Sequence, residues 1–254
     1  MNDAPPLSLA IHGAAGRLGG AVLELALTSP ACALVGATVS ARSALLGRSV
    51  RGEGALSYRG ELDPSVTPTG TVVLELSRVE ALPAHARQAA AEGWPLVVGV
   101  TGLDAPAEAA LAEAAKQIPV LLAPNFSLGI ALLKRLAQEA ANALGPEFDG
   151  AILDVHHRHK RDAPSGTARA LADALEGSGR SVPIVSQRVG EVIGDHTLTF
   201  AGPGERFELR HQAEDRVLFA RGALAAATFL QGRAPGTYTM DDVLAARGGL
   251  ATGP

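Results

Sequence analysis

Short apolar runs alternate with helix-like stretches through the first ~125 residues, and this alternation limits the fold more than any other feature. The apolar runs are Leu7–His12, Cys32–Val39, Thr71–Leu76, Leu96–Val100 and Val120–Leu122. The helix-like stretches are Arg17–Thr28, Arg78–Glu92 and Ala105–Gln117. Strands that are apolar throughout and are joined by helices are typical of a parallel sheet covered on both faces. We therefore expect a doubly wound α/β domain in this half.

The second half of the chain has a different pattern. Ser127–Leu144 has the sequence of one long helix, and the strand-like segments after it alternate apolar and polar residues. These segments are Ala151–Arg158, Ile184–Val189, His196–Phe200 and Glu205–His211. The further helices expected are Thr167–Leu175, Gly222–Leu230 and Met240–Ala246. Because only one helix interrupts these strands, we expect a second, α+β domain with an antiparallel or mixed sheet.

The composition excludes several classes of protein. A chain of 254 residues that is 47% hydrophobic and 19% charged is not wholly disordered. Its formal net charge of −4 argues against a general nucleic-acid binder. Cys32 is the only cysteine, which excludes an intrachain disulfide and a cysteine-rich zinc site. No apolar run reaches the roughly 18–20 residues of a membrane span, and the N-terminus lacks a secretory signal pattern, so we expect a cytoplasmic protein.

Glycines mark the junction between the first strand and the first helix. Gly13, Gly16 and Gly19 give the spacing GxxGxxG rather than GxGxxG. A nucleotide pyrophosphate needs close approach to the backbone and N–H groups at a helix N-terminus, and glycine and alanine allow both. The turn could also be a tight connection that binds no ligand. Its place between a strand and a helix favours dinucleotide binding, and hence a Rossmann-like domain.

The end of the second strand carries no acidic residue. Val39 and Ser40 stand where an acid would bind the ribose hydroxyls of NADH. Ser40 can donate a hydrogen bond, and Arg42 or Arg17 could meet the 2′-phosphate of NADPH, although both arginines could simply be solvated. We therefore expect NADPH to be used at least as well as NADH.

Two more turns follow later strands of the expected sheet. Gly99–Gly102 follows the fourth strand, and Ala123–Phe126 follows the fifth. The ligand crevice of an open parallel sheet lies outside the carboxyl ends of its strands. Either turn alone could be an ordinary loop, but their repetition predicts that both line the crevice beside the nicotinamide.

The segment from Asp154 to Thr167 is the richest in chemically active side chains. It contains His156, His157, His159, Arg158, Lys160 and Arg161. Ser165 and Gly166 then stand at the start of an expected helix. Cations beside a helix N-terminus can bind an anion such as a carboxylate or a phosphate. Histidine can donate or accept a proton near neutral pH, so the segment predicts an acid–base site for an anionic substrate.

Lysine is rare in this chain, which gives Lys160 added weight. Only three of the 22 basic residues are lysines, namely Lys116, Lys134 and Lys160. An ammonium group can release its proton within a useful pH range, whereas a guanidinium group cannot. Lys160 is thus a candidate proton donor, although chance is an alternative because the other two lysines lie on ordinary helices.

Two competing interpretations of this segment are weaker. His157 and His159 share a strand face and could bind a metal, but no cysteine lies nearby and the arginines would repel a dication. A nucleic-acid patch would need a longer basic stretch with interleaved aromatic residues. We therefore expect neither a metal nor a nucleic-acid partner.

Together these motifs resemble the 4-hydroxy-tetrahydrodipicolinate reductase family, also called dihydrodipicolinate reductases, of lysine and diaminopimelate biosynthesis. The resemblance extends from Gly13–Gly19 to Tyr238–Leu244, and HHRHKRDAPSGTA at 156–168 is its most specific part. It implies a dinucleotide-binding domain at residues 1–126, rejoined by about 222–254, and a substrate-binding and oligomerisation domain at 127–221. It also implies a homotetramer joined through the sheets of the second domain.

The resemblance also implies roles for individual residues. His156 and Lys160 match the proton-transfer pair of the family. Positions that hold the substrate carboxylates match His157, Lys160, Ser165, Gly166 and Thr167. Cofactor contacts match Gly13, Ala14, Ala15, Gly16, Arg17, Leu18, Gly99, Val100, Thr101, Ala123, Pro124, Asn125 and Phe126.

The implied reaction is transfer of a hydride from NADH or NADPH to a cyclic imine with two carboxylates, which converts 4-hydroxy-tetrahydrodipicolinate to tetrahydrodipicolinate. This chain departs from many members at Val39–Ser40, where they carry an acid and an arginine, and at Glu75–Ser77, where they read Asp-Phe-Thr. A non-catalytic sensor of NAD(P) and a reductase of another carboxylated imine are the alternatives. The intact His-Lys segment favours an enzyme over a sensor.

Overall fold

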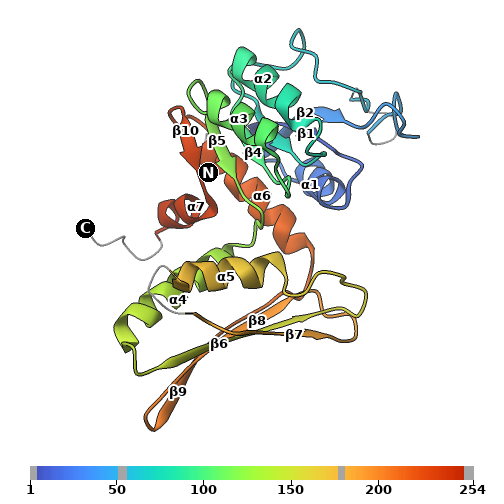
Figure 1. The fold of residues 1–254 in the computed structure, drawn as a ribbon. Coiled ribbons are helices and arrows are strands. Elements are labelled where there is room, and N and C mark those ends of the chain that lie inside the picture. Colours follow the sequence, from blue (N-terminus) through green and yellow to red (C-terminus); the bar gives the residue numbers. More distant parts are fainter. Residues whose placement is uncertain (1–4, 51–55, 177–180, 249–254) are drawn as a thin grey trace. The chain divides into compact units, whose positions relative to one another are not determined.

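The computed structural model describes residues 5–50, 56–176 and 181–248, and the chain forms two compact units (Figure 1). Unit 1 comprises Met1–Phe126 and Phe219–Pro254, and unit 2 comprises Ser127–Leu218. Each unit has its own sheet and its own helices. Within the described residues, every helix is too short or too polar to cross a membrane.

The sheet of unit 1 has six parallel strands in the order β10-β5-β4-β3-β1-β2. The strands are β1 (Leu7–His12), β2 (Cys32–Thr38), β3 (Val72–Glu75), β4 (Leu96–Val98), β5 (Pro119–Leu122) and β10 (Gly236–Tyr238). The prediction of a doubly wound parallel sheet is confirmed. Strand β10 was not predicted, because three residues beginning with glycine form no apolar run.

Helices cover the sheet of unit 1. They are α1 (Arg17–Thr28), α2 (Leu82–Glu92), α3 (Ala105–Ala114), α6 (Val217–Leu230) and α7 (Met240–Ala246). Helices α2 and α3 pack together, and their apolar residues share a core with Val73 and Val98 of the sheet. Helix α2 begins four residues later than predicted, because Arg78–Ala81 forms hydrogen-bonded turns before it.

The sheet of unit 2 has four strands in the order β7-β6-β8-β9. The strands are β6 (Asp149–His156), β7 (Ile184–Arg188), β8 (Asp195–Gly202) and β9 (Glu205–Gln212). Strands β6 and β7 are parallel, and the other two pairs are antiparallel. The prediction of a second domain with a mixed sheet is therefore confirmed.

Among the described residues of unit 2, helices pack on one face of this sheet. Helices α4 (Leu128–Leu144) and α5 (Gly166–Glu176) contribute to a core that contains Ile152, Leu198 and Phe200. The side chains that alternate with these residues point to the opposite face, as the period of a strand requires. That face carries Val185, which is 56% exposed.

Candidate active site

Polar side chains replace the apolar core at the end of β6. Asp154 and His156 follow Ile152 on the covered face, and the sheet register places His196 of β8 opposite Asp154. All three side chains are buried, and the Asp154 side chain has no exposed surface. Burying ionisable groups is costly unless they are paired, so their partners define what this cluster can do.

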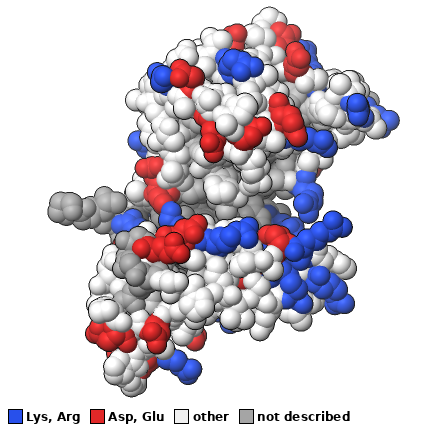
Figure 2. Space-filling model, viewed as in Figure 1, with Lys and Arg blue, Asp and Glu red and all other residues white. Residues whose placement is uncertain are grey.

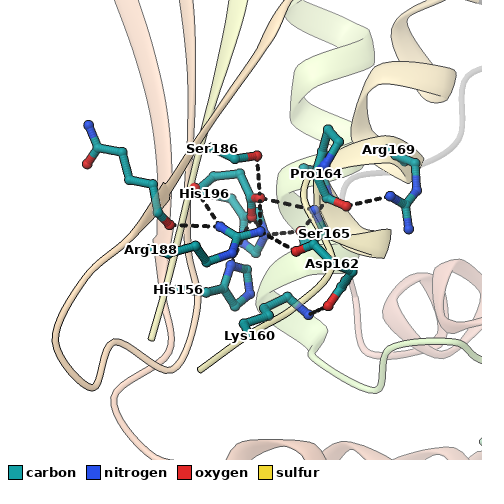
Figure 3. A network of polar contacts seen from close by, with 12 residues as sticks. His156, Lys160, Asp162, Pro164, Ser165, Arg169, Ser186, Arg188 and His196 are labelled. Atoms are coloured by element: carbon teal, nitrogen blue, oxygen red, sulfur yellow. Dashed lines mark hydrogen bonds and ion pairs between the residues drawn. The ribbon is translucent and has the colours of Figure 1, made fainter. Parts of the chain in front are cut away.

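Asp154 is the centre of a polar network that joins β6, β7 and the start of α5. Its partners Ser165, Ser186 and Arg188 are shown in Figure 3. Its Oδ2 accepts hydrogen bonds from the Ser165 backbone N–H, the Ser186 hydroxyl and Arg188 Nη2, at 3.0, 3.0 and 3.1 Å. Its Oδ1 lies 2.9 Å from His156 Nδ1. Burial by itself would raise the pKa of Asp154, but the hydrogen bonds from Ser165, Arg188 and Ser186 lower it to about 2. Asp154 is therefore a carboxylate at neutral pH.

The two buried histidines beside Asp154 are neutral at physiological pH. Burial lowers the pKa of His156, and the charges of Lys160 and Arg188 add to this effect while Asp154 opposes it. Burial lowers the pKa of His196 to about 4, helped by the charge of His156. Their rings meet edge to face with centroids 5.3 Å apart. A neutral imidazole can accept or relay a proton, so His156 suits acid–base chemistry.

Lys160 lies in the loop that follows β6, next to His156 (Figure 3). Its Nζ is 2.8 Å from Asp162 Oδ1, and its side chain is 22% exposed. Arg188 Nη2 also donates to the Asp162 carbonyl oxygen at 2.6 Å, which ties this loop to β7. Figure 2 shows Lys and Arg side chains gathered at the end of unit 2 that carries this loop. An anionic substrate would be attracted to this surface.

At the start of α5, the Ser165 side chain is buried and hydrogen-bonded, whereas the next residue, Gly166, is exposed. The Ser165 hydroxyl accepts from the Ala168 N–H at 3.1 Å and lies 3.3 Å from His196 Nε2, so this side chain is engaged inside the protein. Gly166 is exposed, and there is open space where a Cβ would stand. The N-terminal end of a helix carries a partial positive charge, so the Gly166–Thr167 end of α5 suits a carboxylate.

Asp154, Ser186, Arg188 and His196 form part of this cluster but were not among the residues that sequence reasoning selected. Asp154 lies within the dense segment, whereas the others come from β7 and β8 and reach it only through strand pairing. The selected residue His157 is half-buried, and its ring centroid lies 6.3 Å from that of His159.

The group Asp154, His156 and His196 could hold a metal by distance alone, because one ligand atom of each lies within 4.8 Å of the others. However, Arg188 occupies one oxygen of Asp154, and the charge of Lys160 reaches His156. Two fixed cations beside a dication are unfavourable. The cluster therefore suits proton transfer better than metal binding.

The glycine turn of unit 1 is built by backbone contacts. Gly13 has φ +78°, and a Cβ there would lie 2.5 Å from the Leu76 carbonyl oxygen. A Cβ on Gly19 would lie 2.2 Å from the Gly13 carbonyl oxygen. Helix α1 begins after Gly16 with no side-chain cap on its first N–H groups. Ala15, Gly16 and Arg17 are exposed, so a phosphate could approach these N–H groups closely.

The other predicted cofactor residues follow β2, β4 and β5 at the same edge of the sheet. After β2, Val39 is buried, whereas Ser40 and Arg42 are exposed. After β4 and β5, Gly99 packs closely on Phe126, because a Cβ on this glycine would lie 2.6 Å from the phenyl ring. The remaining predicted positions are exposed at Thr101 and Pro124, partly exposed at Leu18 and Asn125, and buried at Ala14, Val100 and Ala123.

Comparison with known proteins identifies the family. The family model "dihydrodipicolinate reductase, N-terminus" matches residues 7–126, and "dihydrodipicolinate reductase, C-terminus" matches residues 129–244. The chain belongs to the dihydrodipicolinate reductase family. The resemblance seen in the sequence is confirmed. The chain is an NAD(P)H-dependent reductase of lysine and diaminopimelate biosynthesis that acts on a dicarboxylate.

Individual relatives match over nearly their whole length. The 4-hydroxy-tetrahydrodipicolinate reductase of Myxococcus xanthus is 41% identical, over 92% of this chain and 96% of the relative. That of Xanthomonas campestris pv. campestris is 42% identical, over 94% and 98%. A dipicolinate-bound dihydrodipicolinate reductase from Paenisporosarcina sp. TG-14 superposes with a TM-score of 0.80 at 22% identity, over 92% and 97% of the two chains. This last likeness supports the fold.

Proposed function

We propose that Lys160 and His156 handle the proton in the reduction of 4-hydroxy-tetrahydrodipicolinate by this chain. The observation that carries the proposal is the buried Asp154 network, which holds neutral His156 beside the loop of Lys160. When bound, the nicotinamide supplies the hydride. The net reaction adds a hydride and a proton to the ring and releases its 4-hydroxyl group as water. The Lys160 ammonium can donate the proton and His156 can relay it.

The start of α5 is the proposed grip for the substrate. Gly166 and Thr167 offer backbone N–H groups at the positive end of the helix, where a carboxylate is stabilised. Lys160 and His157 lie in the loop before the helix and would hold the second carboxylate. Ser165 contributes indirectly, because its hydroxyl caps the helix and its N–H binds Asp154. Two fixed carboxylates would orient the ring for hydride and proton transfer.

The carboxyl edge of the sheet in unit 1 is the proposed cofactor site. The turn from Gly13 to Leu18 would bind the pyrophosphate, and the turns at Gly99–Thr101 and Ala123–Phe126 would flank the nicotinamide. Val39 provides neither a hydrogen bond to ribose hydroxyls nor repulsion of a 2′-phosphate. Arg42, with Arg17 as second choice, would contact that phosphate, so NADPH is the favoured cofactor.

The open face of the sheet in unit 2 supports a homotetramer. Val185 on β7 and Val189 just after it are 56% and 54% exposed, and Leu153 lies between Val185 and Thr197 in the register. An apolar sheet face must be covered, and closed symmetric assemblies are the common solution. A chain with a single cysteine forms no intrachain disulfide, which fits a reducing compartment such as the cytoplasm.

A spectrophotometric assay tests the proposed function. The substrate is generated enzymatically in the cuvette, and nicotinamide oxidation is followed with and without this protein. The wild type should oxidise NADPH only when the substrate is present, and Lys160→Ala should lose most of this activity. Cofactor binding without substrate-dependent oxidation would favour a sensor and would overturn the proposal.

A further inference from the structure

Unit 1 has a buried polar cluster of its own, whereas the Asp154 network belongs to unit 2. His12, Thr38 and Glu75 end β1, β2 and β3, and the register places them in one row across the sheet. His85 of α2 lies over this row, with its ring stacked on that of His12 at 3.7 Å and 5°. This row lies at the carboxyl ends of the paired strands β1 and β3, between which the strand order reverses, and an open α/β sheet binds ligands at such a point.

Every oxygen of the Glu75 carboxylate is engaged. Oε2 lies 2.5 Å from His85 Nδ1, and Oε1 accepts from the Ser77 backbone N–H at 2.9 Å and from the Ser77 hydroxyl. The Glu75 side chain has no exposed surface, whereas that of His85 is 18% exposed. Burial would raise the pKa of Glu75, but the hydrogen bond from His85 and the charges of His12 and His85 lower it. Glu75 is therefore a carboxylate, and Nδ1 of His85 must carry the hydrogen that binds it.

The carboxylate that contacts His85 also binds the turn that follows β3. Leu76 and Ser77 form this turn, and the Ser77 N–H and hydroxyl both bind the carboxylate. The turn packs closely against two glycines that are proposed to contact the cofactor. A Cβ on Gly13 would lie 2.5 Å from the Leu76 carbonyl oxygen, and a Cβ on Gly99 would lie 2.7 Å from Leu76 Cδ2. A shift of the turn by a few tenths of an ångström would therefore change the shape of both glycine segments.

We propose that Glu75 and His85 are positioning residues for cofactor binding. The hydrogen-bonded carboxylate fixes the Leu76–Ser77 turn, and this turn fixes the glycine segments against which the cofactor packs. The inference rests on the proposed assignment of Gly13 and Gly99 to the cofactor. A metal at this cluster fits less well, because Glu75 is fully engaged and His12 Nδ1 lies 2.8 Å from the Thr38 hydroxyl.

Substitutions of His85 test this role, because His85 is the partly exposed member of the pair and its replacement leaves the Glu75 side chain in place. His85→Leu removes the donor to Glu75, whereas His85→Gln keeps an N–H group that can reach the carboxylate. Arg87→Ala, at an exposed position of the same helix, is the matched control. Gly13→Ala reports on the proposed cofactor site itself.

The readouts are the KM for NADPH, the KM for the substrate, kcat and the dissociation constant of NADPH by calorimetry. His85→Leu should weaken NADPH binding about tenfold, the equivalent of one lost hydrogen bond to a charged group, and change kcat and substrate KM less than about twofold. His85→Gln should recover most of the affinity, and Arg87→Ala should behave as the wild type.

The outcomes separate this inference from the proposed function. If Gly13→Ala weakens NADPH binding and folded His85→Leu does not, the positioning role is wrong and the cofactor site stands. If Gly13→Ala leaves the affinity unchanged, the proposed cofactor site itself is wrong. Equal losses in His85→Leu and His85→Gln, shared by kcat and both KM values, would indicate a merely structural role and would also overturn the inference.

Discussion

The two units build their sites from different materials. In unit 2, charged side chains do the work: the Asp154 carboxylate binds Ser165, Ser186 and Arg188, and it holds His156 close to Lys160. In unit 1, the glycine turn is shaped by backbone, and a Cβ on Gly13 or Gly19 would clash with a carbonyl oxygen. Losing a side chain should damage the first site, whereas gaining one should damage the second.

This contrast follows from the two ligands. A dinucleotide needs a surface that its phosphates can approach closely, which backbone N–H groups provide. A small dicarboxylate that must gain a proton needs a donor at a set position, which only a supported side chain provides. Unit 1 also contains a charged group, the Glu75 carboxylate paired with His85, but its proposed role is to position the glycine segments rather than to contact the ligand.

The largest expected effect is the loss of the proposed proton donors. Lys160→Ala should lower kcat by about 10²–10⁴-fold, the usual contribution of a general acid, and His156→Ala should also lower it. Both variants should bind NADPH almost as the wild type does, because they change unit 2 alone. Steady-state kinetics on both proteins provide the measurement. Turnover close to that of the wild type in both would show that the proton comes from elsewhere.

Removal of the buried carboxylate should come next in size. Asp154→Ala leaves Arg188 and two histidines without their shared partner, so we expect the free energy of unfolding to fall by about 3–5 kcal/mol. Asp149→Ala is the matched control, because it removes an exposed acid from the same strand. Urea unfolding of the three proteins measures the difference. Equal stability of both variants would contradict a central role for Asp154.

The pH dependence of the same variant sharpens the comparison. Asp154 has a pKa of about 2 in the folded protein, below its ordinary value of 3.8. A depressed carboxylate pKa stabilises the fold above pH 3.8, and this stabilisation is lost as the pH falls towards 2. The gap in unfolding free energy between wild type and Asp154→Ala should therefore narrow between pH 4 and pH 2. A gap that stays constant across this range would mean that the carboxylate is not specifically stabilised.

A charge placed on the open sheet face of unit 2 should disrupt the oligomer, whereas a charge on the surface of unit 1 should not. We expect a wild-type mass near 104 kDa, four times the chain mass of 25.9 kDa. Val185→Asp places a charge on the open face and should give a species of half that mass or less. Val66→Asp, at a position of unit 1 that is 57% exposed, should leave the mass unchanged. Light scattering distinguishes these results, and a wild-type monomer at micromolar concentration would refute the tetramer.

The smallest effect concerns Arg42 and Arg17, the charged side chains of unit 1 that are proposed to contact the 2′-phosphate of NADPH. Arg42→Ala should raise the KM for NADPH about tenfold and leave that for NADH unchanged, and Arg17→Ala should have a weaker effect. Kinetics with both cofactors measure this. A strong preference of the wild type for NADH, untouched by either substitution, would show that both arginines are only solvated.

The sequence predicted strands and helices well where burial leaves a periodic signal. Leu7–His12, Arg17–Thr28 and Met240–Ala246 have the predicted bounds. Strand β10 could not be found, because Gly236–Tyr238 is short and only partly buried and is defined by its pairing with β5. The start of α2 is set by local turns rather than by the apolar pattern, whereas its end at Glu92 is the predicted one.

The residues of the site divide in the same way. The dense segment after β6 marked His156 and Lys160 as candidates, because several reactive side chains are adjacent in sequence. Arg188 and His196 reach the site only through the register of β7 and β8, which cannot be predicted from a single sequence. Likewise, the pairing of Glu75 with His85 depends on how α2 packs on the sheet.

The most direct test of this division between the units is to measure NADPH dissociation constants by calorimetry for two variants. Lys160→Ala removes a side chain from unit 2, and Gly19→Ala adds one to unit 1, 2.2 Å from the Gly13 carbonyl oxygen. We predict that Lys160→Ala keeps the wild-type dissociation constant within about twofold while Gly19→Ala raises it by at least about tenfold. The reverse result, with affinity lost in Lys160→Ala and kept in Gly19→Ala, would contradict the account.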